Sequence, residues 1–260
     1  MDSKKLMLDM TVTENTPLGS LYGLLKLVPA NGSELPDMKP GQFVQVEVAD
    51  SKTTYLRRPI SINFVDRSSN SLWLLVRKAG EGTRHLAAAE VGKTINVILP
   101  LGRGFGIDDV AGKKVLLVGG GVGVAPLLYL GAKLREQGVM PDFLLGARSA
   151  KDLLQLDDFA KTGNVFTSTE DGSHGEKGLV TTNSVFDRAY DKIFCCGPMP
   201  MMKAVAAVAR QKGIDCEVSL ENKMACGIGA CLCCVEKKND GHNVCVCTDG
   251  PVFNINELPW

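Results

Sequence analysis

The chain has 260 residues, enough for two domains of about 100–200 residues each. Hydrophobic residues make up 45% of it, which suffices for well-packed cores. Its 29 Lys and Arg residues balance its 29 Asp and Glu residues, so no charged surface is expected to recruit nucleic acid or an anionic membrane.

The cysteine content points to metal ligation in the cytoplasm. The N-terminal stretch lacks the apolar core of a signal peptide, and no segment reaches the length of a membrane span. We therefore expect a cytoplasmic protein, in which thiols stay reduced. Nine cysteines then favour metal binding over disulfides.

The first hundred or so residues have the pattern of a β-barrel or sandwich. Runs such as 43–48 and 71–77 are short, rich in β-branched or aromatic residues, and partly alternating. Turn-forming residues separate such runs at 29–32, 39–41 and 66–70. Many short strands without long helical patterns predict an all-β domain here.

Strands and helices alternate from about residue 112 onward. A continuous apolar run at 114–118 enters a glycine-rich loop and then a helical stretch at 125–137. We predict further strands at 142–147, 164–168 and 192–196, a helix at 198–212, and a short helix at 84–89 in the first domain. The alternation indicates a parallel α/β sheet.

A cysteine- and glycine-rich run near the C-terminus carries the strongest signal. Cys226, Cys231, Cys234 and the later Cys247 have the ligand spacing of a plant-type [2Fe–2S] cluster. Glycines 227 and 229 can take positive φ and turn backbone N–H groups toward sulfur. Structural zinc is the alternative, but zinc ribbons usually present paired Cys-x2-Cys knuckles.

Other cysteines complicate the choice of ligands. Cys233 directly precedes Cys234, and Cys245 precedes Cys247 by two positions, so strand periodicity does not separate the latter two. We favour Cys247 because Asp-Gly-Pro after it can turn the chain sharply. Three further cysteines, at 195, 196 and 216, are expected to be small buried thiols in or beside strands.

Four short segments are candidates for nucleotide binding. A glycine loop between a buried strand and a helix lets phosphate approach the backbone, although this one is not a full G-x-G-x-x-G motif and a tight turn is the alternative. An arginine pair at a strand start and a Gly-Thr helix start could also hold phosphate, or could be a solvated strand end and an N-cap. The segments are Gly119-Gly120-Gly121-Val122-Gly123, Cys196-Gly197-Pro198, Arg57-Arg58-Pro59 and Gly80-Glu81-Gly82-Thr83.

Taken in order, these motifs resemble the ferredoxin–NADP reductase superfamily, and within it the electron-transfer subunits of B-type dihydroorotate dehydrogenases. Met-Ala-Cys-Gly-Ile-Gly-Ala-Cys at 224–231 is the most specific match. The resemblance implies an FAD-binding β-barrel at 1–108, an NAD-binding α/β domain at 109–216 and a [2Fe–2S] module at 217–260. Cys233 departs from the pattern, since a small non-ligand residue is usual there.

The resemblance also implies roles for single residues. One FAD per chain would contact Arg58, Pro59, Ile60, Ser61, Leu75, Val76, Arg77, Gly82 and Thr83. NAD would exchange at Gly119, Gly120, Gly121, Gly123, Cys196, Gly197 and Pro198, and one [2Fe–2S] cluster per chain would be held by Cys226, Cys231, Cys234 and Cys247. No side chain is expected to act as a general base, and no residue is expected to be catalytic.

The implied partner is a separate FMN-containing catalytic subunit, in a heterotetramer of two of each chain. Electrons from dihydroorotate would pass from FMN through the cluster and FAD to NAD+, in pyrimidine biosynthesis. A flavin belongs between cluster and nicotinamide because the cluster carries one electron and hydride carries two.

Two other functions remain open. One is a diaphorase-type subunit of an NAD(P)H:ferredoxin, hydrogenase or sulfite reductase complex. The other is a redox-sensing or zinc-binding module. Preference between NAD and NADP is open as well, because Arg148 follows a strand where an arginine could meet a 2′-phosphate.

Overall fold

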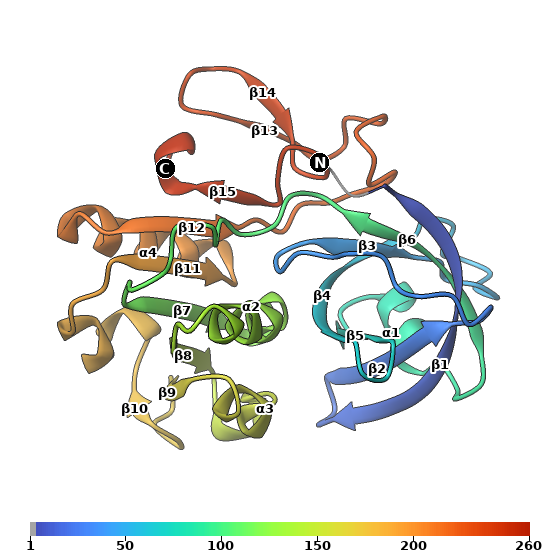
Figure 1. The fold of residues 1–260 in the computed structure, drawn as a ribbon, viewed down its shortest axis with the longest axis horizontal. Coiled ribbons are helices and arrows are strands. Elements are labelled where there is room, and N and C mark those ends of the chain that lie inside the picture. The colour runs from blue at the N-terminus through green and yellow to red at the C-terminus, as the bar shows by residue number, and fades with distance from the viewer. Residues whose placement is uncertain (1–3) are drawn as a thin grey trace. The chain divides into compact units, whose positions relative to one another are not determined.

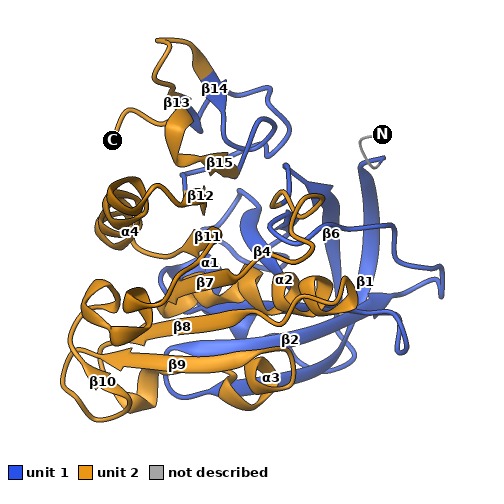
Figure 2. Cartoon of the chain, turned by 60° about the vertical axis from the view of Figure 1, so that its left-hand side comes forward, with its two compact units in different colours: residues 1–104, 222–236, 244–251 blue, residues 105–221, 237–243, 252–260 orange. Residues whose placement is uncertain are grey.

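The computed structural model describes residues 4–260, which form two compact units (Figure 2). Of the described residues, the first unit comprises 4–104, 222–236 and 244–251, and the second comprises 105–221, 237–243 and 252–260. The predicted boundary near 217 falls within a strand, and the predicted C-terminal module divides between both units.

The first unit contains a closed antiparallel barrel of six strands in the order β1-β2-β5-β4-β3-β6 (Figure 1). A short helix, α1, follows β5. The bounds are β1 Leu6–Leu18, β2 Tyr22–Pro29, β3 Phe43–Val46, β4 Arg58–Asp66, β5 Ser71–Arg77, α1 Glu81–Ala87 and β6 Thr94–Leu101. The predicted strand at 71–77 is confirmed, and the helix predicted at 84–89 instead begins at Glu81.

Apolar side chains fill the barrel. Val12, Leu27 and Leu74 are fully buried and come from three different strands. Register shifts interrupt the ladders between Val12 and Glu14 and between Ile62 and Phe64. Such irregularities increase local twist, which helps a sheet of six strands to close.

The second unit is built on a seven-stranded sheet in the order β10-β9-β8-β7-β11-β12-β15. All neighbouring strands are parallel except β15, which pairs antiparallel with β12. The strands are β7 Val115–Gly120, β8 Asp142–Ala147, β9 Asn164–Thr169, β10 Glu176–Lys177, β11 Lys192–Cys196, β12 Asp215–Ser219 and β15 Val252–Asn254. The predicted β-barrel plus parallel α/β architecture is thereby confirmed.

Helices cover both faces of this sheet. The α2 and α3 helices lie on one face and α4 lies on the other (Figures 1 and 2). Pro126 and Pro200 stand in the first turns of α2 and α4, where a missing N–H costs nothing. The bounds are α2 Ala125–Glu136, α3 Leu156–Ala160 and α4 Met199–Lys212, with 3-10 turns η1 Gly121–Val124, η2 Ala150–Asp152, η3 Val180–Thr182, η4 Ser184–Asp187 and η5 Ile255–Glu257.

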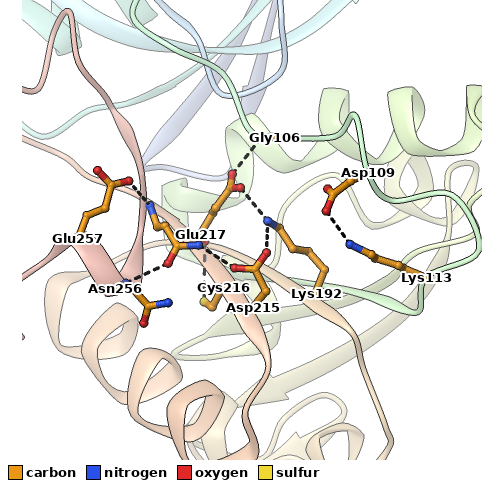
Figure 3. A network of polar contacts seen from close by, with 10 residues as sticks. Gly106, Asp109, Lys113, Lys192, Asp215, Cys216, Glu217, Asn256 and Glu257 are labelled. Atoms are coloured by element: carbon orange, nitrogen blue, oxygen red, sulfur yellow. Dashed lines mark hydrogen bonds and ion pairs between the residues drawn. The ribbon is translucent and has the colours of Figure 1, made fainter.

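A buried ion-pair network joins β11 to β12 (Figure 3). The Lys192 side chain, 5% exposed, donates to Asp215 at 2.5 Å and to Glu217 at 2.8 Å. The other carboxylate oxygen of Glu217 accepts from the Gly106 N–H at 2.9 Å. The network therefore ties the segment that leads into the sheet to two of its strands.

The strands β13 (Val235–Lys237) and β14 (Asn243–Cys245) form a two-stranded sheet. Their connection contains a turn with Gly241 at φ +84°. Among the helices of residues 4–260, none is long and apolar enough to cross a membrane.

Candidate functional site: a cysteine loop with two nucleotide-type turns

The loop between β12 and β13 wraps its backbone N–H groups around cysteine sulfurs. Gly227 and Gly229 have φ of +72° and +84°, the left-handed region that glycine adopts without strain. The N–H groups of Ile228 and Cys231 both donate to the Cys226 sulfur at 3.4 Å. The glycines thus have the role that their spacing predicts.

The distant Cys247 joins the same loop. The Gly229 N–H donates to the Cys247 sulfur at 3.1 Å, and the Cys247 N–H donates to the Cys234 sulfur at 3.4 Å. Side-chain hydrogen bonds also link Cys226 with Cys231 and Cys234 with Cys247. The four predicted ligands therefore meet as two pairs.

Backbone donors and burial act in opposite directions on these thiols. At Cys226, burial raises the pKa, but donors from Ile228, Cys231 and Ala230 outweigh it and lower the pKa to about 6. At Cys247, burial and the Cys234 thiol raise the pKa to about 12 despite the Gly229 donor. The backbone donors therefore favour the thiolate at Cys226, and burial disfavours it at Cys247.

The competing cysteines lie differently. Cys233 is exposed. Cys245 belongs to a turn in which its N–H donates to the Asp249 carboxylate at 2.8 Å, and its carbonyl accepts from the Asp249 N–H at 2.8 Å. Burial, followed by the nearby Cys234 and Asp249, raises the pKa of Cys245. The backbone of Cys245 thus stabilises the turn in which Cys247 lies. The choice of Cys247 over Cys245 as a ligand stays a prediction.

Within residues 4–260, no three His, Cys, Asp or Glu side chains are arranged to hold a single metal ion. The cysteine loop instead offers two thiols at each of two places.

The residues predicted to hold a flavin come together on the barrel. β4 and β5, which carry 58–61 and 75–77, are neighbours, and α1 with Gly82 and Thr83 follows β5. A Cβ at Gly82 would lie 2.8 Å from Arg58 Nε and 2.9 Å from Thr54 Cγ2. Glycine at 82 therefore lets the guanidinium group pack against the first turn of α1.

Two of these side chains also serve the local backbone. The Thr83 hydroxyl accepts from the N–H groups of Gly80 and Ala79 at 3.0 and 3.1 Å, which caps α1. Arg57 donates to the carbonyl and side-chain oxygens of Asn96 at 3.0 and 2.6 Å. Of the arginine pair, Arg57 is tied to β6, and Arg58 is the one that reaches α1.

The two glycine turns of the second unit pack against each other. β7 and β11 are adjacent parallel strands with Gly119 opposite Cys196. A Cβ at Gly123 would lie 2.5 Å from both the Cys196 carbonyl oxygen and the Gly197 Cα. Since β8 lies on the other side of β7, the turns meet at the point where strand order reverses, the usual ligand position in open α/β sheets.

Cysteines 195, 196 and 216 are buried, as the sequence predicts. Burial raises the pKa of each thiol, so all three are protonated near neutral pH. They are small apolar residues of the sheet rather than candidate ligands.

Sequence reasoning missed two residues. Gln45 lies in β3 and is fully buried, although alternation with Val44 and Val46 makes it look like a solvent-facing position. Lys192 is buried at the start of β11, where a lysine before an apolar run looks like a strand end in water. Neither has a local signal, because residues distant in the chain bury each of them.

Comparison with known proteins assigns the family. A family model described as the iron-sulfur cluster binding domain of dihydroorotate dehydrogenase B matches residues 221–259. The dihydroorotate dehydrogenase B (NAD(+)) electron transfer subunit of Shouchella clausii is 43% identical over 225 residues, covering 85% of this chain and 86% of that protein. The chain belongs to this family.

Other relatives agree with that assignment. The subunit of the same name from Fusobacterium nucleatum is 39% identical over 259 residues, covering 96% of this chain and 97% of its own length. Among solved structures, one chain of an NADH-dependent reduced ferredoxin-NADP oxidoreductase superposes with a TM-score of 0.85 at 29% identity, covering 96% of this chain and 90% of that chain. The FAD/NAD binding domain of a Vibrio cholerae nitric oxide dioxygenase shares the fold, with a TM-score of 0.68 at 22% identity over 81% of this chain and 98% of that chain.

Proposed function

We propose that this chain is the electron-transfer subunit of a dihydroorotate dehydrogenase B. It would pass electrons from the FMN of a catalytic subunit through a [2Fe–2S] cluster and FAD to NAD+, in the pyrimidine (UMP) pathway. The observation that carries the proposal is the convergence of Cys226, Cys231, Cys234 and Cys247 on one glycine-shaped loop. Membership of the family supports the choice of substrate.

The cysteine loop fits a [2Fe–2S] cluster, which accepts and releases one electron without breaking bonds. Cys226 and Cys231 would hold one iron, and Cys234 and Cys247 the other. N–H groups that already donate to three of these sulfurs would stabilise the added negative charge of the reduced cluster. Reduced thiols of this kind suit the cytoplasmic location expected from cysteine usage.

The barrel fits FAD, which can exchange electrons singly or in pairs. Arg58 and the first turn of α1 would bind the pyrophosphate, because a guanidinium group forms charge-assisted hydrogen bonds with phosphate oxygens. Pro59, Ile60, Ser61 and the segment 75–77 would position the flavin ring against β4 and β5. Thr83 would act mainly by fixing the loop that α1 follows.

The paired glycine turns fit a dinucleotide, NAD in this proposal. At Gly123 the first turn lies directly against the backbone of Cys196 and Gly197, where a Cβ would not fit. Hydride transfer between nicotinamide and flavin needs alignment rather than a general base, so the task of these residues is positioning. Arg148, at the end of β8, would be a surface arginine in an enzyme that uses NAD.

A separate FMN-containing subunit would complete the enzyme, in a heterotetramer of two of each chain. The cluster loop exposes apolar side chains, with Ile228 at 48% and Leu232 at 64% exposure, beside the exposed Cys231. Apolar surface around an electron-transfer group suits a docking partner that must come within a short distance of it.

Co-expression with the FMN-containing subunit tests the proposal. We expect a complex with FAD, iron and sulfide that reduces NAD+ when dihydroorotate is added. A complex that contains these groups and FMN but reduces no NAD+ with dihydroorotate would rule out the substrate. A preparation with stoichiometric zinc and no flavin would instead support the zinc-binding alternative.

A diaphorase-type subunit is the second candidate. It is favoured by the TM-score of 0.85 with a chain of a ferredoxin-NADP oxidoreductase. The same complex assayed with NADH or NADPH and ferredoxin separates the two: ferredoxin reduction in the absence of any dihydroorotate activity would favour the diaphorase.

A further inference from the structure

Gln45 has a buried amide without a partner. Its side chain is fully buried in β3, and neither Nε2 nor Oε1 finds a hydrogen-bond partner among residues 4–260. Leaving such a group unpaired costs about 1–3 kcal/mol, so natural proteins rarely do so without a bound partner. The amide therefore points to a group that the chain binds.

The strands beside Gln45 cannot supply that partner. Its neighbour in β4 is Pro59, which has no N–H, and its neighbour in β6 is the apolar Ile98. The Gln45 backbone carbonyl already accepts from Arg57 Nη1 at 3.4 Å. Inside the barrel wall, the side-chain amide has no polar counterpart.

The cysteine loop covers this amide. A Cβ at Gly227 would lie 2.6 Å from Gln45 Cγ and 2.8 Å from Gln45 Nε2. Gly227 directly follows Cys226, whose sulfur already accepts from two N–H groups of the same loop. The Gln45 amide thus lies against the loop at Gly227, the residue next to a predicted ligand.

We propose that Gln45 Nε2 donates a hydrogen bond to a sulfur atom of the [2Fe–2S] cluster and raises its reduction potential. The inference rests on the cluster of the proposed function. One-electron reduction adds a negative charge to the cluster, and a donor to sulfur stabilises that charge. Gln45 is accordingly a tuning residue, which changes the potential without taking part in any bond that forms or breaks.

Isotope labelling of the complete complex tests the contact directly. The protein is produced with glutamine labelled with 15N at the side-chain amide, the cluster is reduced, and pulsed EPR measures hyperfine coupling to 15N. We expect a coupling in the wild type and in Gln42→Leu, and none in Gln45→Leu. Absence of the coupling in a wild-type protein with a full cluster overturns the proposal.

Gln42 provides a matched control. It is also a buried glutamine, but its side chain accepts from the Lys39 N–H at 2.7 Å and donates to the Gly102 carbonyl at 2.8 Å. Gln42→Leu should lower the melting temperature of the apo-protein and leave the midpoint potential unchanged. Gln45→Leu should shift the potential to more negative values without lowering the apo-protein's melting temperature, because it removes an unpaired amide.

The results separate this inference from the proposed function. An unchanged potential in Gln45→Leu with full iron and sulfide overturns the role of the amide and leaves the proposed function standing. If the wild-type complex binds no iron and sulfide, the proposed function fails first. If Gln45→Leu does not assemble the cluster, the 15N coupling of the wild type still tests the contact. A coupling supports the hydrogen bond, and its absence overturns the proposal.

Discussion

Replacing Lys192 by Met removes the cation that pairs with both Asp215 and Glu217 and keeps most of the side chain's apolar length. Breaking a buried ion pair costs about 3–5 kcal/mol, because a charge stays buried without its partner. Asp215 is 42% exposed and can be rehydrated, whereas Glu217 is 14% exposed and cannot. We therefore expect the substitution to destabilise this region by about 3 kcal/mol, the lower end of that range, mostly because Glu217 stays buried without its partner.

Native-state hydrogen exchange of amides in β11 and β12 is the suitable assay, because it reports local opening in a chain with two units. A loss of about 3 kcal/mol accelerates exchange through opening about 100-fold. Lys113→Met serves as the control, since the exposed Lys113–Asp109 pair, 2.6 Å apart, is screened by solvent and its loss should leave exchange nearly unchanged.

The pH dependence has a definite sign. Burial lowers the pKa of Lys192, but the hydrogen bonds that its ammonium group donates to Asp215 and Glu217 outweigh burial and raise the pKa above 10.5. This stabilisation is fully present below pH 10.5 and is lost as the pH rises through the folded-state value. Burial raises the pKa of Asp215, but Lys192 and Asn254 outweigh it and hold the pKa below 3.8, so its contribution is lost only as the pH falls through that lower value.

The difference between wild type and Lys192→Met should therefore stay constant from pH 6 to pH 8, after correction for intrinsic exchange. Adding Glu217→Gln should recover part of the loss, because the buried negative charge is gone and the amide oxygen can still accept from Gly106. Equal exchange rates in wild type and Lys192→Met, or no recovery in the double variant, would refute the reasoning.

Three further predictions address the candidate sites. Gly123→Ala should raise the dissociation constant of NADH by roughly 10- to 100-fold, because its Cβ displaces the turn at Cys196; titration with NADH should show this, and an unchanged constant would contradict the placement of NAD. Cys233→Ser should keep stoichiometric iron and Cys234→Ser should lose it, as iron analysis will show; the reverse pattern would exchange the two assignments. Arg58→Gln should weaken FAD binding by about 1.5–3 kcal/mol, measured by equilibrium dialysis, since a charged donor to phosphate is lost; full retention of FAD would argue against a phosphate contact.

Sequence patterns with a local cause predict the structure well. The strands at 142–147 and 192–196 have the predicted bounds because each is a compact apolar run between polar residues. The cysteine spacing and the positive φ of Gly227 and Gly229 can likewise be predicted from one short segment. Neighbouring residues determine these elements, so a single sequence is enough to predict them.

Features that depend on distant residues could not be predicted. Gln45 becomes buried only because a loop near residue 227 returns to β3, and Lys192 is paired only once β12 lies beside β11. The antiparallel β15 is three residues long, too short for any periodicity to reveal that it joins a parallel sheet.

The C-terminal segment is divided between the two units and does not form a separate domain. Residues 222–236 and 244–251 belong with the barrel, while 237–243 and 252–260 belong with the sheet. A chain cut after residue 221 would lose β15 and leave the outer edge of β12 unpaired, a surface on which strands of other molecules could add. Deleting the C-terminal portion would therefore destabilise the parallel sheet as well as remove the cysteine loop, whereas substituting single cysteines would leave β15 in place.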